Sequence, residues 1–111
     1  MRRLILIWTT GERETALKMI IPYAKNSLLQ GWWEEVTLIV WGASTKLVAE
    51  DIELQRQIAE LSEHGIRLES CKWCADQFNV SEKMIELGFD NKYMGEVLTE
   101  YLQRDEKVLT F

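Results

Sequence analysis

Short apolar runs alternate with longer amphipathic segments along the chain. The runs at 4–8 and 36–41 are continuously apolar or rich in β-branched residues, as in strands buried on both faces of a sheet. Segment 66–70 predicts a third strand and 107–111 a terminal one, whereas 89–94 is ambiguous and is a candidate short strand. We therefore expect about five strands.

Apolar residues at helical spacing fill the segments between these strands. The first helix follows Thr9 or Thr10, either of which can cap it, and runs up to Gly31. Pro22 lies inside this helix and is expected to kink it or to remove one hydrogen bond. Further helices are predicted over 44–64 with a candidate break near Glu50, from Cys71 onward for a short stretch, over 81–88, and over 95–104.

Strands that alternate with helices predict a parallel sheet with right-handed crossovers. The chain has 111 residues, which is near the commonest domain size, and we find no linker, repeat or low-complexity segment in it. We predict a single α/β domain over 1–111, with a mostly parallel sheet of about five strands between helices.

Net charge and the length of the apolar runs argue against two classes of partner, nucleic acids and membranes. Thirteen Lys and Arg against eighteen Asp and Glu give a net charge of -5, so no excess positive field favours direct binding to nucleic acid. The apolar run at 4–8 is too short for a membrane span or a signal peptide, and no small-residue cleavage site follows it. We expect a cytoplasmic protein with neither nucleic acid nor membrane as a partner.

Residues that can carry chemistry gather at the carboxyl ends of the predicted strands, which is where open parallel sheets bind ligands. Three of the five tryptophans and both cysteines fall at this edge. The candidate site residues there are Trp8, Thr9, Thr10, Trp41, Gly42, Cys71, Lys72, Trp73 and Cys74.

Cys71 is the candidate nucleophile. It lies where a strand becomes a helix, so the helix N-terminus and the adjacent Lys72 favour its thiolate. A thiolate is the attacking group in both sulfur transfer and disulfide exchange. Cys74, one helical turn further on, is placed to resolve a persulfide or to form a disulfide. The competing interpretation is a pair of buried structural cysteines, because free Cys is often buried.

The three tryptophans at this edge also have two interpretations. Trp8, Trp41 and Trp73 either line an apolar pocket that keeps water from a reactive sulfur or pack in the core or in an interface.

We expect neither a metal nor a cofactor. Zinc normally takes four ligands, and one CxxC with the distant His64 supplies too few, although four cysteines shared across a dimer would suffice. The phosphate-binding patterns GxGxxG and GxxxxGK[ST] do not occur, and no Ser/His/Asp arrangement stands out.

Several segments, in order and spacing, carry a resemblance to a known family. They are the first strand with its Thr9-Thr10 loop, 36–42, 64–71, Cys74-Ala75 followed by Val80, 93–95 and 108–111. Together they resemble the DsrE/DsrF-like family of small sulfur-relay proteins, which includes subunits of tRNA 2-thiouridine synthesis and of dissimilatory sulfur oxidation. The resemblance covers nearly the whole chain. It implies a flavodoxin-like three-layer fold and a homo-oligomer, commonly a trimer or hexamer.

The resemblance also implies a role for Cys71, which matches the family cysteine that carries sulfur as a persulfide after the third strand. Cys74 has no counterpart in the single-cysteine relay subunits, and some members lack the cysteine altogether. Three functions therefore stay open. They are a sulfurtransferase-like sulfur carrier with unidentified donor and acceptor proteins, a CxxC thiol–disulfide redox protein, and a non-catalytic oligomeric adaptor.

Overall fold

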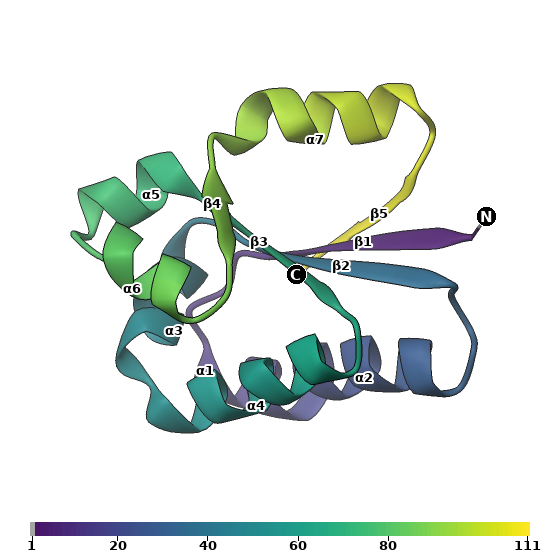
Figure 1. Ribbon diagram of the computed structural model, residues 1–111, viewed down its shortest axis with the longest axis horizontal. Helices are drawn as coiled ribbons and strands as arrows, with labels where there is room; N and C mark the ends of the chain where they lie inside the picture. Colours follow the sequence, from purple (N-terminus) through teal and green to yellow (C-terminus); the bar gives the residue numbers. More distant parts are fainter. Residues whose placement is uncertain (1) are drawn as a thin grey trace.

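The computed structural model describes residues 2–111. They contain a five-stranded sheet and the helices that connect its strands (Figure 1). Its strands are β1 (Arg3–Trp8), β2 (Glu35–Val40), β3 (Arg67–Cys71), β4 (Asp90–Lys92) and β5 (Lys107–Thr110). They pair in parallel in the order β4-β3-β2-β1-β5. The predicted fold class is confirmed, and the ambiguous segment 89–94 contains the strand β4.

Helices connect each strand to the next. The first connection contains α1 (Arg13–Thr15), a π-helical turn η1 (Ala16–Ile20) and α2 (Ile21–Leu29). The second contains α3 (Ala43–Glu50) and α4 (Ile52–Glu63), the third α5 (Lys72–Gln77) and α6 (Ser81–Glu86), and the last α7 (Met94–Gln103). No helix of the described residues is long and apolar enough to cross a bilayer.

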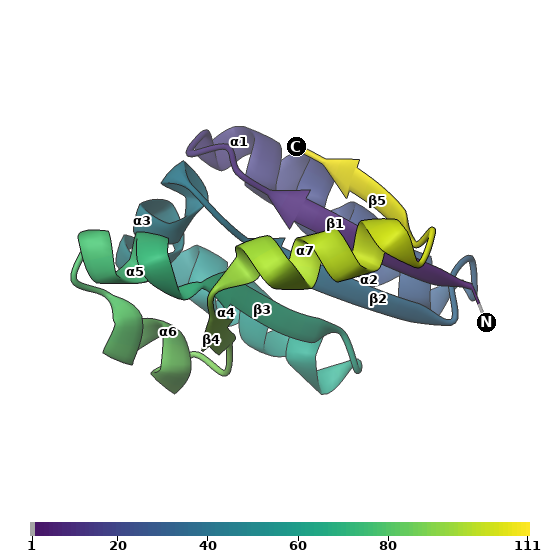
Figure 2. The same ribbon diagram turned by 90° about the horizontal axis from the view of Figure 1, so that it is seen from above.

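The two faces of the sheet are covered unequally. The helices α1 to α4 lie on one face, whereas α7 crosses the other (Figures 1 and 2). Because side chains alternate along a strand, Leu4, Leu6 and Trp8 of β1 enter the core under α1 to α4, and Ile5 and Ile7 face α7. We call these two sides the main-core face and the α7 face.

The connections differ from expectation in two details. Thr9 does not cap the first helix, because its N–H and hydroxyl both donate to the carbonyl of Phe111 and continue the β1–β5 pairing. Thr10 does not cap this helix either, because its hydroxyl accepts the N–H of Glu12. Glu12 is the cap, and its carboxylate accepts the N–H groups of Glu14 and Thr15. Pro22 lies in the first turn of α2, directly after the π turn η1, rather than in the middle of one continuous α-helix, and its missing N–H falls at this helix start.

Candidate functional site

Two buried thiols lie together at the carboxyl end of β3. Cys71 is the last residue of that strand and Cys74 lies in the following helix α5, and both are free. Their exposed fractions are 4% and 9%, so both residues are largely buried. They pack on the α7 face in a cluster with Ile7, Ile39 and Met94. This site is a sheltered thiol pair rather than an exposed one.

The surroundings of Cys74 keep its thiol protonated. Burial raises the pKa of Cys74, the backbone N–H of Gly42 acts in the opposite direction, and the adjacent Cys71 raises the pKa further. At neutral pH the Cys74 S–H is therefore a hydrogen-bond donor available to the neighbouring sulfur.

Two of the other predicted site residues lie beside the cysteines. Trp41 packs against the cysteine cluster, half-buried, directly after β2. Gly42 adopts a φ of 74°, a left-handed conformation that disfavours any side chain, and this brings its amide to Cys74.

The remaining predicted residues are placed elsewhere. Trp8 is fully buried in the main core, on the opposite face of the sheet from Cys71, and its indole N–H donates to the Thr10 carbonyl. The Thr9 hydroxyl donates to the carbonyl of Phe111, the Thr10 hydroxyl accepts the N–H of Glu12, and Trp73 is 60% exposed. These residues do lie at the edge of the sheet where the strands end. Because side chains alternate between the two faces of a strand, however, Trp8 points away from the cysteines.

Lys72 follows Cys71 but its charge is already compensated. Its ammonium lies 2.7 Å from the carboxylate of Asp76 and 5.3 Å from the ring centre of Tyr93. The bond to Asp76 raises the pKa of Lys72, so the group stays charged and stays engaged with that carboxylate.

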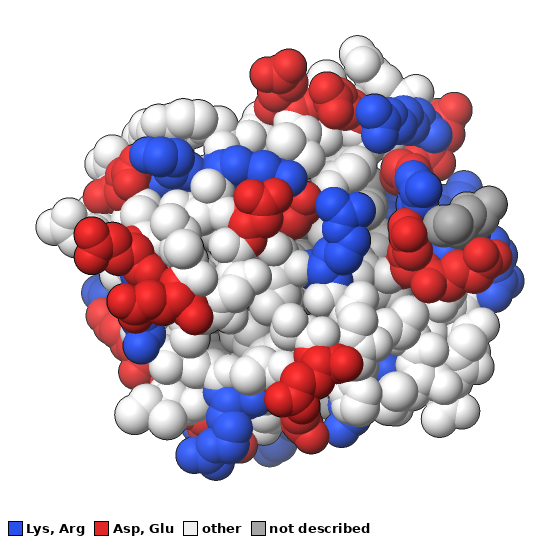
Figure 3. All heavy atoms as spheres, viewed as in Figure 1, with Lys and Arg blue, Asp and Glu red and all other residues white. Residues whose placement is uncertain are grey.

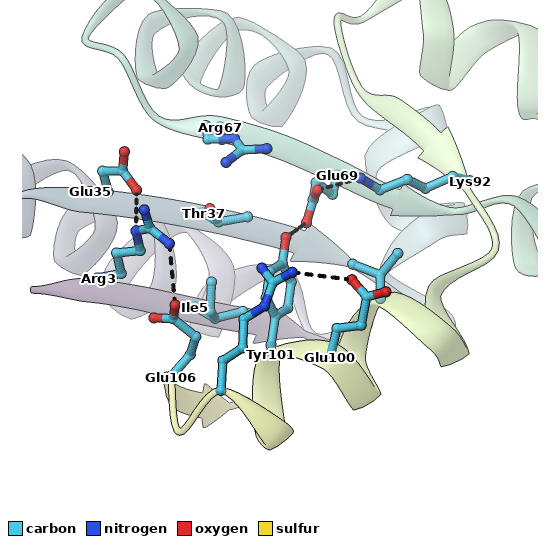
Figure 4. Close-up of a pocket in the computed structure, with 12 residues that line it drawn as sticks. Arg3, Ile5, Glu35, Thr37, Arg67, Glu69, Lys92, Glu100, Tyr101 and Glu106 are labelled. Atoms are coloured by element: carbon cyan, nitrogen blue, oxygen red, sulfur yellow. Dashed lines mark hydrogen bonds and ion pairs between the residues drawn. The ribbon is translucent and has the colours of Figure 1, made fainter. Parts of the chain in front are cut away.

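A second polar group on the same face of β3 escaped the sequence analysis. Glu69 is two residues before Cys71 and only 1% exposed. Each oxygen of its carboxylate accepts a hydrogen bond: Tyr101 donates to Oε1 at 2.7 Å and Lys92 to Oε2 at 2.6 Å (Figure 4). Burial, followed by the bond to Glu69, raises the pKa of Tyr101 to about 12. Burial would lower the pKa of Lys92, but its bonds to Asp90 and Glu69 outweigh this and raise it.

A sequence signal for this group does exist. Arg67, Glu69 and Cys71 occupy alternate positions of one strand, so they share a face of the sheet. Charged residues at such positions indicate that the face is not filled by an apolar layer alone.

The outer charge pattern agrees with an acidic protein of mixed surface. On the face drawn in Figure 3, Lys and Arg side chains lie among Asp and Glu side chains, and no broad basic area is visible. Within residues 2–111, no group of three or more His, Cys, Asp or Glu side chains is arranged to hold a metal ion.

The parallel sheet with its connecting helices defines a small flavodoxin-like α/β protein, in which the two free cysteines Cys71 and Cys74 lie together at the end of β3. The model of the DsrE/DsrF-like family matches residues 4–111, so the chain belongs to the DsrE/DsrF-like family.

Three solved structures are similar to this chain. A conserved protein of unknown function from Bacteroides thetaiotaomicron is 42% identical, with a TM-score of 0.96 over 98% of this chain and 94% of that one. A protein of unknown function from Methanobacterium thermoautotrophicum (13% identity, TM-score 0.79) and the ychN protein of E. coli (16% identity, TM-score 0.75) match over 100% of both chains. At these low identities the last two support the fold alone. No curated protein matches the chain.

Proposed function

We propose that this protein is a sulfur carrier that holds a sulfane sulfur as a persulfide on Cys71. Membership of the DsrE/DsrF-like family supports a sulfur-relay kind of function. The observation that carries the proposal is the buried pair itself, in which a protonated Cys74 lies against Cys71. A neighbouring S–H donor stabilises a thiolate, and a water-poor setting protects a persulfide from side reactions.

The transfer requires no net oxidant or reductant. The Cys71 thiolate attacks the outer sulfur of a donor persulfide R–S–SH, forms Cys71–S–SH and releases the donor as R–S⁻. An acceptor thiolate then attacks the outer sulfur of Cys71–S–SH, takes it as its own persulfide and leaves Cys71 as the thiolate. Cys74 assists by hydrogen bonding to the sulfur that carries negative charge in each state.

Burial adds a condition to this scheme. Because both sulfurs are largely enclosed, a small persulfide reaches Cys71 more readily than a thiol on another folded protein does. Transfer between proteins then requires local opening of the α5 segment, which carries the exposed Trp73 as a contact for a partner.

The test is the intact mass of the reduced protein after incubation with a small sulfane-sulfur donor, followed by alkylation and site mapping. We expect one added sulfur atom on Cys71, its complete loss in Cys71→Ser and its retention in Cys74→Ser. The double variant Cys71→Ser/Cys74→Ser is the matched control for sulfur that binds elsewhere.

Other outcomes of this experiment would overturn the proposal. A loss of two hydrogens that joins Cys71 to Cys74 would favour thiol–disulfide redox chemistry, in which both cysteines are required. No added sulfur, together with thiols that stay unreactive until the protein unfolds, would favour an adaptor with structural cysteines.

We further propose that the protein acts in the cytoplasm, where reducing conditions preserve both thiols, and as a homo-oligomer. Exposed apolar side chains on one side of the molecule support self-association, because Trp32 is 51% and Leu29 50% exposed, and Trp32 lies against Tyr23. Sedimentation equilibrium is expected to give a trimer or hexamer, and Trp32→Ser to shift it toward monomer. A monomeric wild-type protein at micromolar concentration would contradict this.

A further inference from the structure

A cavity opens between α7 and the amino-terminal half of the sheet, apart from the cysteines (Figure 4). Its volume is about 210 Å³, below the roughly 300–1,000 Å³ of pockets for drug-sized ligands, so it suits a molecule of few atoms. Ile5 and Val97 supply apolar lining, and the rest of the wall is polar or charged.

The charges of this cavity balance overall but not locally. Four basic and four acidic side chains line it. Arg3 is shared between Glu35, at 2.8 Å, and Glu106, at 3.3 Å, so this corner keeps one surplus negative charge.

Another part of the lining has a surplus positive charge. Arg67 makes no ion pair with any of residues 2–111, whereas the other basic residues of the lining do. Its partner across the β2–β3 pair is Thr37, which lies beside it in Figure 4.

Thr37 supports a ligand at this position. The residue is 4% exposed and lines the cavity, and its hydroxyl makes no hydrogen bond within residues 2–111. Because this hydroxyl is open to the cavity, it can donate to an oxygen acceptor of a bound group. Arg67 and Thr37 together offer a fork of N–H donors and one O–H donor to a carboxylate.

We propose that this cavity binds a small amino carboxylate, with its carboxylate on Arg67 and Thr37 and its ammonium group toward Glu35 and Glu106. A zwitterion matches both surplus charges, whereas a simple anion would meet the uncompensated carboxylates. The buried Glu69, bound by Tyr101 and Lys92, forms a fixed wall beside Arg67 and stays outside the ligand contacts.

The test is a titration of the ¹⁵N-labelled full chain followed by amide chemical shifts. The probes are glycine, β-alanine and γ-aminobutyrate, which separate the two charges by increasing distances, and acetate and methylammonium, which carry one charge each. We expect one of the zwitterions to shift the amides of Ile5, Thr37 and Arg67 saturably, with a Kd in the millimolar range or tighter, and the single-charge probes to bind more weakly.

Variants separate binding from general effects. Arg67→Gln is expected to weaken binding about tenfold or more, since it removes charged hydrogen bonds, and Thr37→Val to weaken it less. Arg56→Gln, an exposed change on α4 whose arginine pairs with Glu53, is the control and should bind as the wild type does. Cys71→Ser should also bind normally, which makes this result independent of the sulfur-carrier proposal.

Three results would overturn the proposal. The first is the absence of saturable shifts at these amides with every zwitterion. The second is acetate binding as tightly as the best zwitterion, which would make the cavity a plain anion site. The third is unchanged affinity in Arg67→Gln while the variant keeps the wild-type spectrum.

Discussion

The buried carboxylate of Glu69 governs the ionisation of its neighbour Tyr101. In the folded protein the pKa of Tyr101 is about 12, whereas a tyrosine in the unfolded chain has a pKa of about 10. Between these values the unfolded state binds fewer protons than the folded state. The stability from this contact is therefore complete below the ordinary tyrosine pKa and is lost as the pH rises toward the folded value.

Tyrosinate absorbance against pH checks this behaviour. Of the three tyrosines, one should ionise in a late, separate phase. Tyr101→Phe should remove that phase, and Tyr93→Phe, at an exposed position, should leave it in place. A single phase near the ordinary pKa in the wild type would contradict the assignment.

The Cys74 thiol offers a second prediction at this scale. Cys71→Ser leaves Cys74 as the one thiol of the chain, and burial, the largest cause of its raised pKa, persists in the variant. We expect the alkylation rate with iodoacetamide to continue rising with pH beyond the point at which a free thiol levels off. The same variant in urea is the control, and matching profiles in the folded and unfolded states would show that burial has no such effect.

At the scale of elements, Asp51 both separates α3 from α4 and fixes the second helix. Its Oδ1 accepts the N–H of Leu54 at 3.0 Å, and its Oδ2 lies 2.5 Å from Arg13 Nε. Arg13 and the Leu54 N–H lower the pKa of Asp51. Its contribution is thus present above the ordinary carboxyl pKa and is lost as the pH falls through the lower folded value.

Urea unfolding tests this cap. Asp51→Ala should lower the free energy of unfolding by about 1 kcal/mol or somewhat more at neutral pH, as the loss of a helix N-cap does. Asp51→Asn keeps a capping oxygen and should cost less. The difference between wild type and Asp51→Ala should shrink in acid, and a difference that does not change with pH would argue against a role for the charge.

Much of this element order was predictable because apolar runs and helix breaks are local signals. The break near Glu50 and the short helix after Cys71 follow from neighbouring residues, whereas the local pattern leaves 89–94, which contains β4, ambiguous. The face of the sheet toward which a side chain at a strand end points depends on strand register and on the path of α7. No local sequence pattern determines either. For that reason Trp8 was grouped with Cys71, and the Glu69 group was missed although Arg67, Glu69 and Cys71 alternate in the sequence.

At the scale of the whole molecule, both proposed sites lie under the same helix. Met94, in the first turn of α7, packs with the two cysteines, and Tyr101, near its end, binds Glu69 at the cavity. Of the residues of α7, Met94 alone is fully buried, and the following strand β5 pairs with β1 at the edge of the sheet. An opening of α7 and β5 would therefore uncover both sites while the main core stays intact.

Two methionines make a matched test of this asymmetry by hydrogen exchange. Met84 in α6 is 0% exposed in the main core, and Met94 is 1% exposed on the α7 face, so either change to Ala leaves a cavity that costs about 2–5 kcal/mol locally. Met84→Ala should speed exchange of the slowest amides, in β1 and β2, because they open only with the main core. Met94→Ala should speed exchange mainly in α7 and β5 and change those slow amides much less. Equal acceleration at all positions in both variants would show that the two faces of the sheet open as one cooperative unit.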